Sequence, residues 1–506
     1  MIRVRFAPSP TGALHIGGVR TALYNYLYAK KHGGQFILRI EDTDQKRYVA
    51  GAEDYILKSL EWCGIIPDES PKVGGSYGPY RQSERLDLYK QYANQLLDKG
   101  LAYYAFDTPE ALEEMRTKLQ ESKAANQQYS SANRMEMQNS LTMDSTEVDK
   151  LLSSGAPYVI RIKVPAGEVV KVNDIIRGEV IVHTNTMDDK ILMKSDGYPT
   201  YHLANIVDDH LMQISHVIRG EEWLPSAPLH VLLYQSFGWN APTFAHLPLL
   251  LKPTGNGKLS KRDADKLGFP IFPLNWTDPS SGELSEGFKE KGYLPETMVN
   301  FLALLGWNPG TEEEFFSLEE LVKAFELERI SKSGAKFDIQ KANWLNEHYL
   351  RNMPTETLAK ILIVQATKEG QDCSMEKAVS IVKILIERCI FPQDLWNSGL
   401  YFFVSPTEYD SKTARKKWTL EAVSVLNLFI SLIEKLPNKA TSSVFKEKFE
   451  AAANELGVGL GGVMPALRLA LTGQGGGPDL MAILEVLGVE ESTKRIKTAI
   501  DIIDTK

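Results

Sequence analysis

The first forty residues predict a strand, a sharp turn, a helix and a second strand, and this order constrains the fold more than any other feature of the chain. Residues 2–7 (IRVRFA) alternate apolar and basic side chains, as a strand does, and the prolines that follow end it because proline lacks a ladder donor. Apolar residues then recur at three- and four-residue spacing between Gly18 and Gly33, which predicts a helix, and residues 35–40 (QFILRI) predict the next strand. The connection of such a βαβ unit is right-handed, so we expect an α/β fold with a parallel sheet.

The turn APSPTGALHIGG (residues 7–18) lies where the first strand ends and the first helix begins. Ligands of open α/β sheets bind at this edge, and the exposed N–H groups of a helix start favour an anion. Gly12, Gly17 and Gly18 have no Cβ, so a flat or charged ligand can approach the backbone closely. Taken alone, the stretch is also compatible with a plain turn that carries a surface histidine, His15, because short motifs occur by chance.

Length and composition set broad limits. A chain of 506 residues exceeds a single core and suggests two to four domains. The net charge of −8 argues against a nonspecific coat of nucleic acid but leaves room for local basic patches. There is no apolar run long enough for a bilayer and no signal-peptide block, and the cysteines (Cys63, Cys373 and Cys389) are scattered. We therefore expect a cytoplasmic protein without disulfides or a membrane partner.

The strand and helix alternation continues later in the chain. Residues 214–220 and 244–251 predict two buried strands, and residues 226–239 predict a helix between them with a serine N-cap and a glycine near its end. These elements extend the sheet that the first strand begins.

The segment between the two alternating parts has a different character. It is polar and glutamine-rich around residues 126–140, and residues 158–165 and 179–184 then predict antiparallel strands. We interpret residues 81–190 as a domain inserted into the α/β fold. After about residue 290 the apolar spacing is helical throughout, with Pro295 in a first turn and a capping box at Ser317 and Glu320.

A basic loop, KPTGNGKLSKR (residues 252–262), follows the predicted strand 244–251. Its glycines make a flexible start, and Lys258, Lys261 and Arg262 concentrate positive charge. A mobile cationic loop can close over a polyphosphate and neutralise charge that develops at phosphorus. Most basic runs are solvated loops, but the position at the ligand edge favours the phosphate role here.

Two of these motifs resemble a known pair. HIGG (15–18) resembles the HIGH signature of class I aminoacyl-tRNA synthetases, and KLSKR (258–262) resembles their KMSKS signature, about 240 residues later. Residues 5–29 and 36–44 resemble the opening of the glutamyl and glutaminyl branch, and residues 196–210 and 216–230 resemble its amino-acid pocket. The resemblance runs along the whole chain and is nearest to the bacterial and organellar glutamyl type. One departure is Gly18, which stands in place of the last histidine of the first signature.

The resemblance implies a reaction. Glutamate is activated by ATP with Mg²⁺ to an adenylate and is then transferred to the 3′ end of tRNA(Glu), and positioning and electrostatics do most of the work. His15 would stabilise the transition state at the ATP phosphates, Lys258 and Lys261 would hold the pyrophosphate, and Trp223 would line the route to ATP. The implied catalytic residues are His15, Lys258 and Lys261, and the implied ATP site comprises His15, Gly17, Gly18, Glu222, Lys258 and Lys261.

The resemblance also implies a glutamate pocket with opposite charges for opposite ends of the substrate. Arg5, Ser9 and Arg219 would surround its carboxylates, and Glu41 would anchor its ammonium group. Without the resemblance, Arg5 reads as an exposed strand arginine, residues 41–44 as a helix N-cap cluster, and Tyr201 and Trp223 equally as core aromatics. The implied pocket comprises Arg5, Ala7, Ser9, Glu41, Tyr201, Asn205 and Arg219.

No metal site is expected in the protein. The histidines between 202 and 246 have no HExxH context, so we interpret them as packing or hydrogen-bonding residues. Some members of the family carry cysteines in the inserted domain, but residues 104–107 (YAFD) contain tyrosine, phenylalanine and aspartate there. We therefore expect no zinc.

The predicted architecture is an α/β Rossmann-like catalytic domain with an inserted α+β domain, followed by all-α domains. A helical C-terminal half favours the glutamyl over the glutaminyl type, whose anticodon domain is a β-barrel. We expect a monomer. We also expect the residues from about 370 to 506 to read the anticodon, and the basic and aromatic cluster TARKKW (413–418) is one reason, although that cluster taken alone is more typical of a solvated helix face. The predicted segments are 1–80 and 191–290 (catalytic domain), 81–190 (inserted, acceptor-stem-binding), 291–370 (helical, stem-contacting) and 371–506 (helical, anticodon-binding).

Two other functions stay open at this point. A small cofactor-adenylylating nucleotidyltransferase shares HIGH-like turns but does not need the long helical half. An inactive paralogue that only binds RNA does not need the charged pocket residues. The sequence does not indicate whether tRNA(Gln) is also charged, nor which residues read the anticodon.

Overall fold

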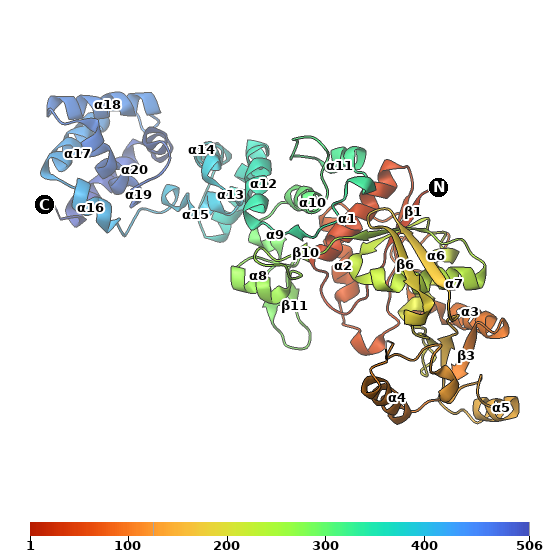
Figure 1. Ribbon diagram of the computed structural model, residues 1–506. Helices are drawn as coiled ribbons and strands as arrows, with labels where there is room; N and C mark the ends of the chain where they lie inside the picture. The colour runs from red at the N-terminus through yellow and green to blue at the C-terminus, as the bar shows by residue number, and fades with distance from the viewer. Residues whose placement is uncertain (125, 505–506) are drawn as a thin grey trace. The chain divides into compact units, whose positions relative to one another are not determined.

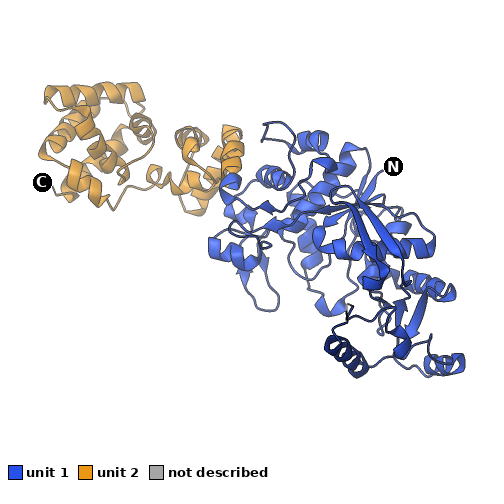
Figure 2. Ribbon diagram, viewed as in Figure 1, with its two compact units in different colours: residues 1–342 blue, residues 343–506 orange. Residues whose placement is uncertain are grey.

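The computed structural model describes residues 1–124 and 126–504, which belong to two compact units, 1–342 and 343–506 (Figure 2). The first unit combines sheets with helices, and the described part of the second contains helices only (Figure 1). Across the described residues, no helix has both the length and the apolar character that crossing a membrane requires.

A parallel strand pair opens the first unit, as the sequence predicts. Strand β1 (Arg3–Phe6) pairs with β2 (Gln35–Leu38), and helix α1 (Ile16–Lys31) connects them. The helix ends at His32, and Gly33 follows with a φ of 59°, a left-handed conformation that costs glycine little. The predicted βαβ unit is therefore confirmed.

Two later parallel strands lie against this pair. β8 (His216–Gly220) pairs with β9 (Thr243–Leu247), and α7 (Ala227–Phe237) connects them. The Ser215 N–H donates to the Arg3 carbonyl oxygen at 2.9 Å, which places β8 beside β1. The parallel strands thus follow the order β2, β1, β8, β9, and the later strands extend the first pair as predicted.

The predicted serine N-cap of α7 is wrong. Ser226 makes no capping hydrogen bond through its side chain, because its backbone is already helical (φ −86°, ψ −16°) at the end of the 3₁₀ turn Glu221–Ser226. An N-cap side chain needs an extended backbone to reach back to the first turn. The glycine end of the helix is confirmed, since Gly238 has a φ of 78°.

The two predicted antiparallel strands of the inserted segment exist, but they belong to different sheets. β4 (Val159–Ile162) lies between β3 (Ala102–Ala105) and β7 (Ile191–Met193). The other strand, β6 (Gly178–His183), forms a hairpin with β5 (Val169–Asp174), and β5 joins β9 in parallel. This hairpin therefore extends the sheet of β8 and β9. Alternation of side chains identifies a strand but not its partner, which explains the difference.

The remaining elements of the first unit surround these sheets. In Figure 1, α4 and α5 flank β3 in the part of the chain predicted to be inserted. Pro295 occupies the first turn of α10, and Ser317 and Glu320 form the predicted capping box of α11. These elements are α2 (Ala52–Trp62), α3 (Leu86–Asp98), α4 (Pro109–Glu121), α5 (Ser145–Ser153), α6 (Tyr201–Leu211), β10 (Leu250–Leu251), α8 (Lys261–Leu267), β11 (Trp276–Thr277), β12 (Leu284–Ser285), α9 (Phe288–Lys291), α10 (Pro295–Leu304), α11 (Leu318–Ala324) and β13 (Ala335–Lys336).

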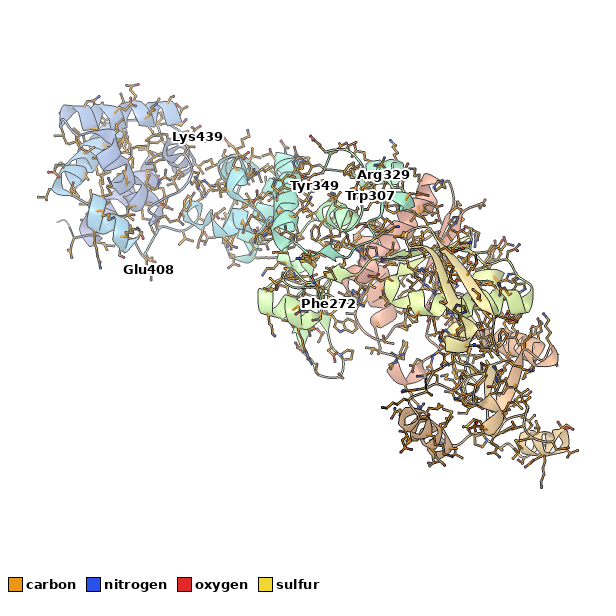
Figure 3. The ribbon with its side chains drawn as sticks, viewed as in Figure 1. Phe272, Trp307, Arg329, Tyr349, Glu408 and Lys439 are labelled. Carbon is orange, nitrogen blue, oxygen red and sulfur yellow. The ribbon has the colours of Figure 1, made fainter. Side chains whose placement is uncertain are left out.

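The end of the first unit is a small core beside α1. The indole of Trp307, drawn in Figure 3, packs against Phe325 with ring centroids 5.6 Å apart, and Phe325 in turn contacts Tyr24 of α1. β10 pairs in parallel with β13, which connects this core to the basic loop that follows β10.

The second unit is helical, as predicted from its apolar spacing. Helix α20 bends at Gly488, whose φ of 77° interrupts the helical backbone. Trp418 is 1% exposed, so the aromatic residue of the cluster 413–418 belongs to the core of this unit and is not available to stack on a base. The helices are α12 (Ile339–Arg351), which crosses the division, α13 (Thr355–Lys368), α14 (Met375–Leu385), α15 (Asp394–Asn397), α16 (Ser411–Lys417), α17 (Leu420–Ile433), α18 (Ser442–Glu455), α19 (Leu460–Thr472) and α20 (Leu480–Ile502).

Candidate active site

A cleft of about 660 Å³ opens where β1 and β8 end and α1 begins. The ends of parallel strands are where a ligand site is expected in such a sheet. Lys258 lines a small adjoining cavity that shares His15, Gly17 and Glu222 with the cleft, and Lys261 lines neither. The predicted residues that line the cleft are Arg5, Ala7, Ser9, His15, Gly17, Gly18, Glu41, Tyr201, Asn205, Arg219, Glu222 and Trp223.

His15 caps helix α1 and faces the cleft. Its Nδ1 accepts the Gly17 N–H at 3.0 Å, so a neutral imidazole carries its proton on Nε2 and can donate from there. Although His15 is exposed to solvent, desolvation by the protein atoms around it lowers its pKa, and the positive charge of Lys258 lowers the pKa further. The side chain is therefore neutral at pH 7 and placed at the anion-favouring end of a helix.

The two glycines of the motif leave room for neighbouring side chains. A Cβ on Gly17 would lie 2.8 Å from Cε1 of the His15 ring, so a side chain there would disturb the cap. A Cβ on Gly18 would lie 2.4 Å from Cδ1 of Leu14, which fills the space beneath the helix start. The glycine at the last position of the HIGG motif therefore fits the close approach of Leu14.

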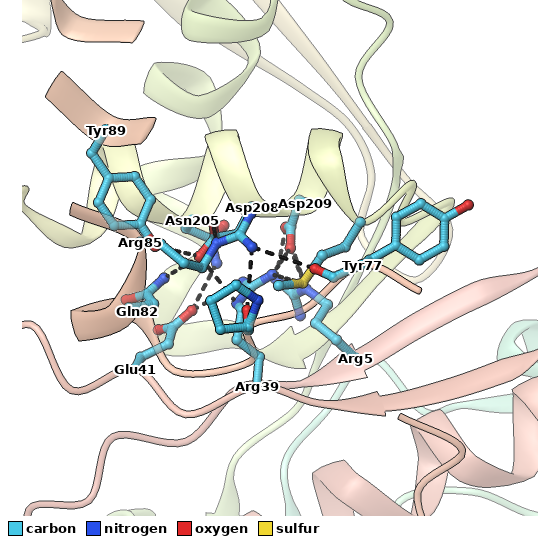
Figure 4. A network of polar contacts seen from close by, with 12 residues as sticks. Arg5, Arg39, Glu41, Tyr77, Gln82, Arg85, Tyr89, Asn205, Asp208 and Asp209 are labelled. Atoms are coloured by element: carbon cyan, nitrogen blue, oxygen red, sulfur yellow. Dashed lines mark hydrogen bonds and ion pairs between the residues drawn. The ribbon is translucent and has the colours of Figure 1, made fainter. Parts of the chain in front are cut away.

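Arg5 and Glu41 belong to a buried network of charges (Figure 4). Asp209 accepts from Arg5 Nε at 3.0 Å and Nη2 at 3.1 Å, and from Arg39 Nη1 at 2.8 Å. Burial lowers the pKa of the Arg5 guanidinium and Asp209 raises it, with a net shift upward, so the arginine stays charged. Of the five Arg5 donors, those on Nη1 meet no acceptor in the described residues, and Arg5 lines the cleft.

Glu41 presents one oxygen to the cleft. Its Oε1 accepts from Arg39 Nη2 at 3.1 Å and from Asn205 Nδ2 at 3.2 Å, whereas Oε2 receives no donor from the described residues. Burial raises the pKa of Glu41, and Arg39 and Arg5 oppose that rise. Glu41 is 7% exposed and caps no helix, so the N-cap interpretation of residues 41–44 fails for Glu41, whereas Asp44 does stand at the N-cap position of the 3₁₀ turn Gln45–Arg47. Oε2 can accept from a cationic ligand.

Arg219 reaches the cleft from β8 with neutral partners only. Its Nη1 donates to the Tyr201 hydroxyl at 2.9 Å and lies 3.3 Å from His230 Nδ1, and its Nε donates to His246 Nε2 at 3.0 Å. Over residues 1–124 and 126–504, no carboxylate lies within ion-pair distance of Arg219. A buried guanidinium in this situation can bind an anion such as a carboxylate.

Tyr201 and Trp223 form the aromatic wall of the cleft. Their ring centroids are 4.2 Å apart with planes tilted by 33°, and Trp223 is 39% exposed. Trp223 is therefore not a core aromatic, whereas Tyr201 is half-buried and hydrogen-bonded to Arg219. Ser9, exposed on the turn, also lines the cleft.

The lysines of the basic loop pair with surface carboxylates. Lys258 Nζ lies 3.5 Å from Glu222 Oε1, and Lys261 Nζ lies 3.2 Å from Glu283 Oε1. Exposed pairs of this kind contribute about 0–1 kcal/mol, so a polyphosphate can displace the carboxylates. Ser260 and Asp263 form a capping box that begins α8 at Lys261.

Sequence reasoning missed the groups that hold these side chains. Arg39 and Asp209 orient Arg5 and Glu41. His246 contacts Arg219 directly, and Asp174 contacts His246. The available signal is the charged pair Asp208 and Asp209 directly after the apolar pair Ile206 and Val207 in helix α6, because buried charges are rare unless they are paired.

The histidines act as packing and hydrogen-bonding residues, as interpreted from the sequence. His216 lies 3.2 Å from the Tyr28 hydroxyl, His210 stacks on Trp239, and His202 contacts His230 at 3.2 Å. The described residues contain no group of three or more histidine, cysteine, aspartate or glutamate side chains arranged for a metal ion.

Comparisons with known proteins agree with one another. Residues 1–344 match a family profile described as tRNA synthetases class I (E and Q), catalytic domain, and residues 342–500 match one described as an anticodon binding domain. A glutamate–tRNA ligase of Amoebophilus asiaticus is 56% identical over 504 residues, covering 99% of this chain and 98% of that protein. The corresponding ligase of Cytophaga hutchinsonii is 55% identical, covering 99% and 97%.

The fold also matches a solved structure. A crystal structure of a glutamate tRNA ligase from Elizabethkingia meningosepticum, in complex with its amino acid, has a TM-score of 0.96 and 49% sequence identity, and the match covers 99% of this chain and 100% of that chain.

Proposed function

The chain belongs to the class I tRNA synthetases of the glutamate and glutamine type, and from that membership we propose that it ligates L-glutamate to the 3′ end of tRNA(Glu). ATP drives the reaction through a glutamyl-adenylate, and AMP and diphosphate are released. The catalytic part of the chain is followed by a helical anticodon-binding part.

The observation that carries this proposal is the arrangement of charges in one cleft. Arg219 lacks a carboxylate partner among the described residues, and Oε2 of Glu41 lacks a donor. A substrate with carboxylates and an ammonium group supplies both missing partners. His15 at the start of α1 and Lys258 in the adjoining cavity offer a place for polyphosphate beside it.

The roles proposed for the site follow from this arrangement. His15 donates from Nε2 to the phosphate that is attacked, Gly17 and Gly18 keep the backbone open to the nucleotide, and Lys258 and Lys261 leave their carboxylates to hold the diphosphate. Arg5, Ala7, Ser9, Glu41, Tyr201, Asn205 and Arg219 form the glutamate pocket, and Glu222 lies on the ATP side. Mg²⁺ enters as part of the MgATP substrate.

We propose the same domain roles as from the sequence. Residues 81–190 bind the acceptor stem, although the hairpin β5–β6 within them extends the catalytic sheet. Residues 291–370 contact the stem and residues 371–506 read the anticodon. We also propose that the protein is a cytoplasmic monomer. Light scattering of the purified protein tests the oligomeric state.

ATP–pyrophosphate exchange, run with glutamate in the presence and absence of tRNA, tests the function. We expect exchange that depends on glutamate and requires tRNA, together with charging of tRNA(Glu) when labelled glutamate is supplied. Exchange that depends on an acid other than glutamate, or a complete reaction that never needs RNA, would indicate a small-molecule nucleotidyltransferase. Tight RNA binding without exchange would indicate an inactive paralogue.

A further inference from the structure

Three buried residues from adjacent strands form a line that ends at the cleft. Asp174 is the last residue of β5, His246 lies in β9 and Arg219 lies in β8. His246 Nδ1 lies 2.6 Å from Asp174 Oδ2, and His246 Nε2 lies 3.0 Å from Arg219 Nε. The Asp174 and His246 side chains are fully buried, and Arg219 is 5% exposed.

The hydrogen bonds allow only one protonation state of the histidine. An ionised aspartate only accepts, so His246 must donate from Nδ1, and an arginine only donates, so His246 must accept at Nε2. The ring is therefore neutral with its proton on Nδ1. Burial lowers the pKa of His246. Burial raises the pKa of Asp174, but the hydrogen bonds that its carboxylate accepts from His246 and from the backbone outweigh burial, so the net shift is downward.

The aspartate is itself held in place by the backbone. Asp174 Oδ1 accepts the N–H groups of Ile176 at 2.9 Å and Arg177 at 2.8 Å, and Oδ2 also accepts the His246 N–H at 3.0 Å. These bonds fix the carboxylate at the point where the β5–β6 hairpin joins β9. The predicted inserted segment thus supplies a group that acts on the catalytic cleft.

These contacts orient the Arg219 guanidinium but do not neutralise its charge. His246 occupies Nε, Tyr201 and His230 lie against Nη1, and Nη2 donates to the Trp223 carbonyl oxygen at 3.4 Å, so all four partners are uncharged. Arg5 differs, because Asp209 already neutralises it. Among the described residues of the cleft, Arg219 therefore keeps a full positive charge for the ligand.

We infer that Asp174 and His246 are positioning residues that aim Arg219 at a substrate carboxylate and keep its charge available, and this inference rests on the proposed glutamate-activating function. A neutral acceptor at Nε matters as much as the geometry, since a carboxylate in that place would satisfy the guanidinium and weaken the demand for an anionic substrate.

The test compares two substitutions of His246 in the full-length protein. In His246→Gln the amide can still donate to Asp174 and accept from Arg219, whereas His246→Leu can do neither. We expect His246→Leu to raise the KM for glutamate about tenfold or more with a change of less than threefold in the KM for ATP, and His246→Gln to recover most of that loss. His246→Phe keeps a ring and repeats the test if the leucine variant does not fold.

A matched control comes from the same sheet. His216 lies in β8 and contacts Tyr28 and Ser215 rather than the cleft, so His216→Leu should leave the KM for glutamate unchanged. The inference is overturned if His246→Leu folds with an unchanged KM for glutamate, if it raises both KM values equally, or if His246→Gln is as impaired as His246→Leu.

A double-mutant cycle separates positioning from a direct role. In an Arg219→Ala background, adding His246→Leu should change kcat/KM for glutamate by less than twofold, because the residue acts through Arg219. A full additional loss would overturn the inference. Charging of tRNA(Glu) by the unmodified protein reports separately on the proposed function, and the rise in Tm caused by glutamate gives a second readout of the variants.

Discussion

Arg5 and Arg219 reach the cleft from neighbouring strands but carry their charges differently. Arg5 shares Asp209 with Arg39, whereas Arg219 is bonded to neutral groups only. At the residue scale, the cleft therefore separates a neutralised arginine from one that needs an anion. The three predictions that follow concern single side chains and depend on such pairings.

His15→Ala tests the role of the helix cap in the transition state. We expect kcat to fall about 100-fold or more while the KM for ATP stays within a few-fold, because a donor aimed at developing charge acts mainly in the transition state. Steady-state kinetics at saturating glutamate and tRNA measure this. A large rise in KM with kcat preserved contradicts the proposed role.

Glutamine should be a poor substrate. Its amide cannot give Arg219 the charged partner that the cleft lacks, and losing such a charge-assisted hydrogen bond costs on the order of 2–3 kcal/mol. The expected ratio of kcat/KM for glutamate over glutamine is therefore about 30 to 150 in pyrophosphate exchange. The sequence predicts that both Arg5 and Arg219 reject glutamine in this way, but Asp209 already neutralises Arg5, so the effect depends on Arg219. Activation of glutamine within threefold of glutamate contradicts it.

His202 should make stability depend on pH. Burial lowers its pKa from 6.5 to about 4, and its Nδ1 accepts from His230, whose own Nδ1 faces Arg219. The unfolded state therefore binds the proton first, so the His202 contribution to stability is present above pH 6.5 and is lost progressively as the pH falls toward 4. Melting curves of His202→Gln should show a smaller loss of Tm over this interval than those of the unmodified protein. Parallel pH profiles would contradict the assignment.

At the scale of elements, the stretch between the two halves of the sheet contributes strands to two different sheets. β3, β4 and β7 form a separate sheet, whereas the β5–β6 hairpin adds to the sheet of β8 and β9. Both carboxylate oxygens of Asp107, just after β3, already accept hydrogen bonds within the protein. Oδ1 accepts the Gln138 N–H at 2.8 Å, and Oδ2 accepts the Tyr129 hydroxyl at 3.1 Å. Its neighbours Tyr104 and Phe106 are aromatic, so this segment offers no thiolate.

The element-scale prediction concerns zinc. Since residues 104–107 carry no cysteine and Asp107 already accepts two hydrogen bonds, the purified protein should contain no stoichiometric zinc. Metal analysis of the protein, before and after treatment with a chelator that spares added Mg²⁺, measures this. One zinc per chain, lost together with activity, would show that the interpretation of this segment is wrong.

At the scale of the whole molecule, the cleft and the matched anticodon binding domain lie in different units. Residues 1–342 contain the cleft, and the helical residues 343–506 match an anticodon binding domain over most of their length. The buried Trp418 supports the fold of the second unit rather than contacting RNA. Of the cluster that the sequence singled out, Arg415, Lys416 and Lys417 form the basic last turn of α16.

The whole-molecule prediction concerns the anticodon. A base that stacks on an aromatic or arginine plane contributes about 1–3 kcal/mol, so replacing the middle or third anticodon base of tRNA(Glu) should lower kcat/KM for charging roughly ten- to a hundredfold. A tRNA(Glu) transcript with a changed variable loop is the control. Unchanged charging of both anticodon variants would require another role for the second unit.

Local signals in the chain determined much of this result. Alternation, helical spacing and proline or glycine boundaries predicted the βαβ unit, the strands near residues 216 and 244 and the helical half, because these periodicities depend only on which face of an element is buried. The HIGG motif and the pocket residues identified with it led to one cleft, and of the KLSKR lysines Lys258 lines the adjoining cavity whereas Lys261 lines neither.

Only the tertiary structure decided how these pieces pair. The partner of a strand, the neutral surroundings of Arg219, the Asp209 that neutralises Arg5 and the burial of Trp418 all depend on residues distant in the chain. Asp174 and His246 are 72 positions apart and meet because β5 pairs with β9. A sequence records which side chains are available, but charge neutralisation and burial arise from contacts between segments, and those contacts exist only after the chain has folded.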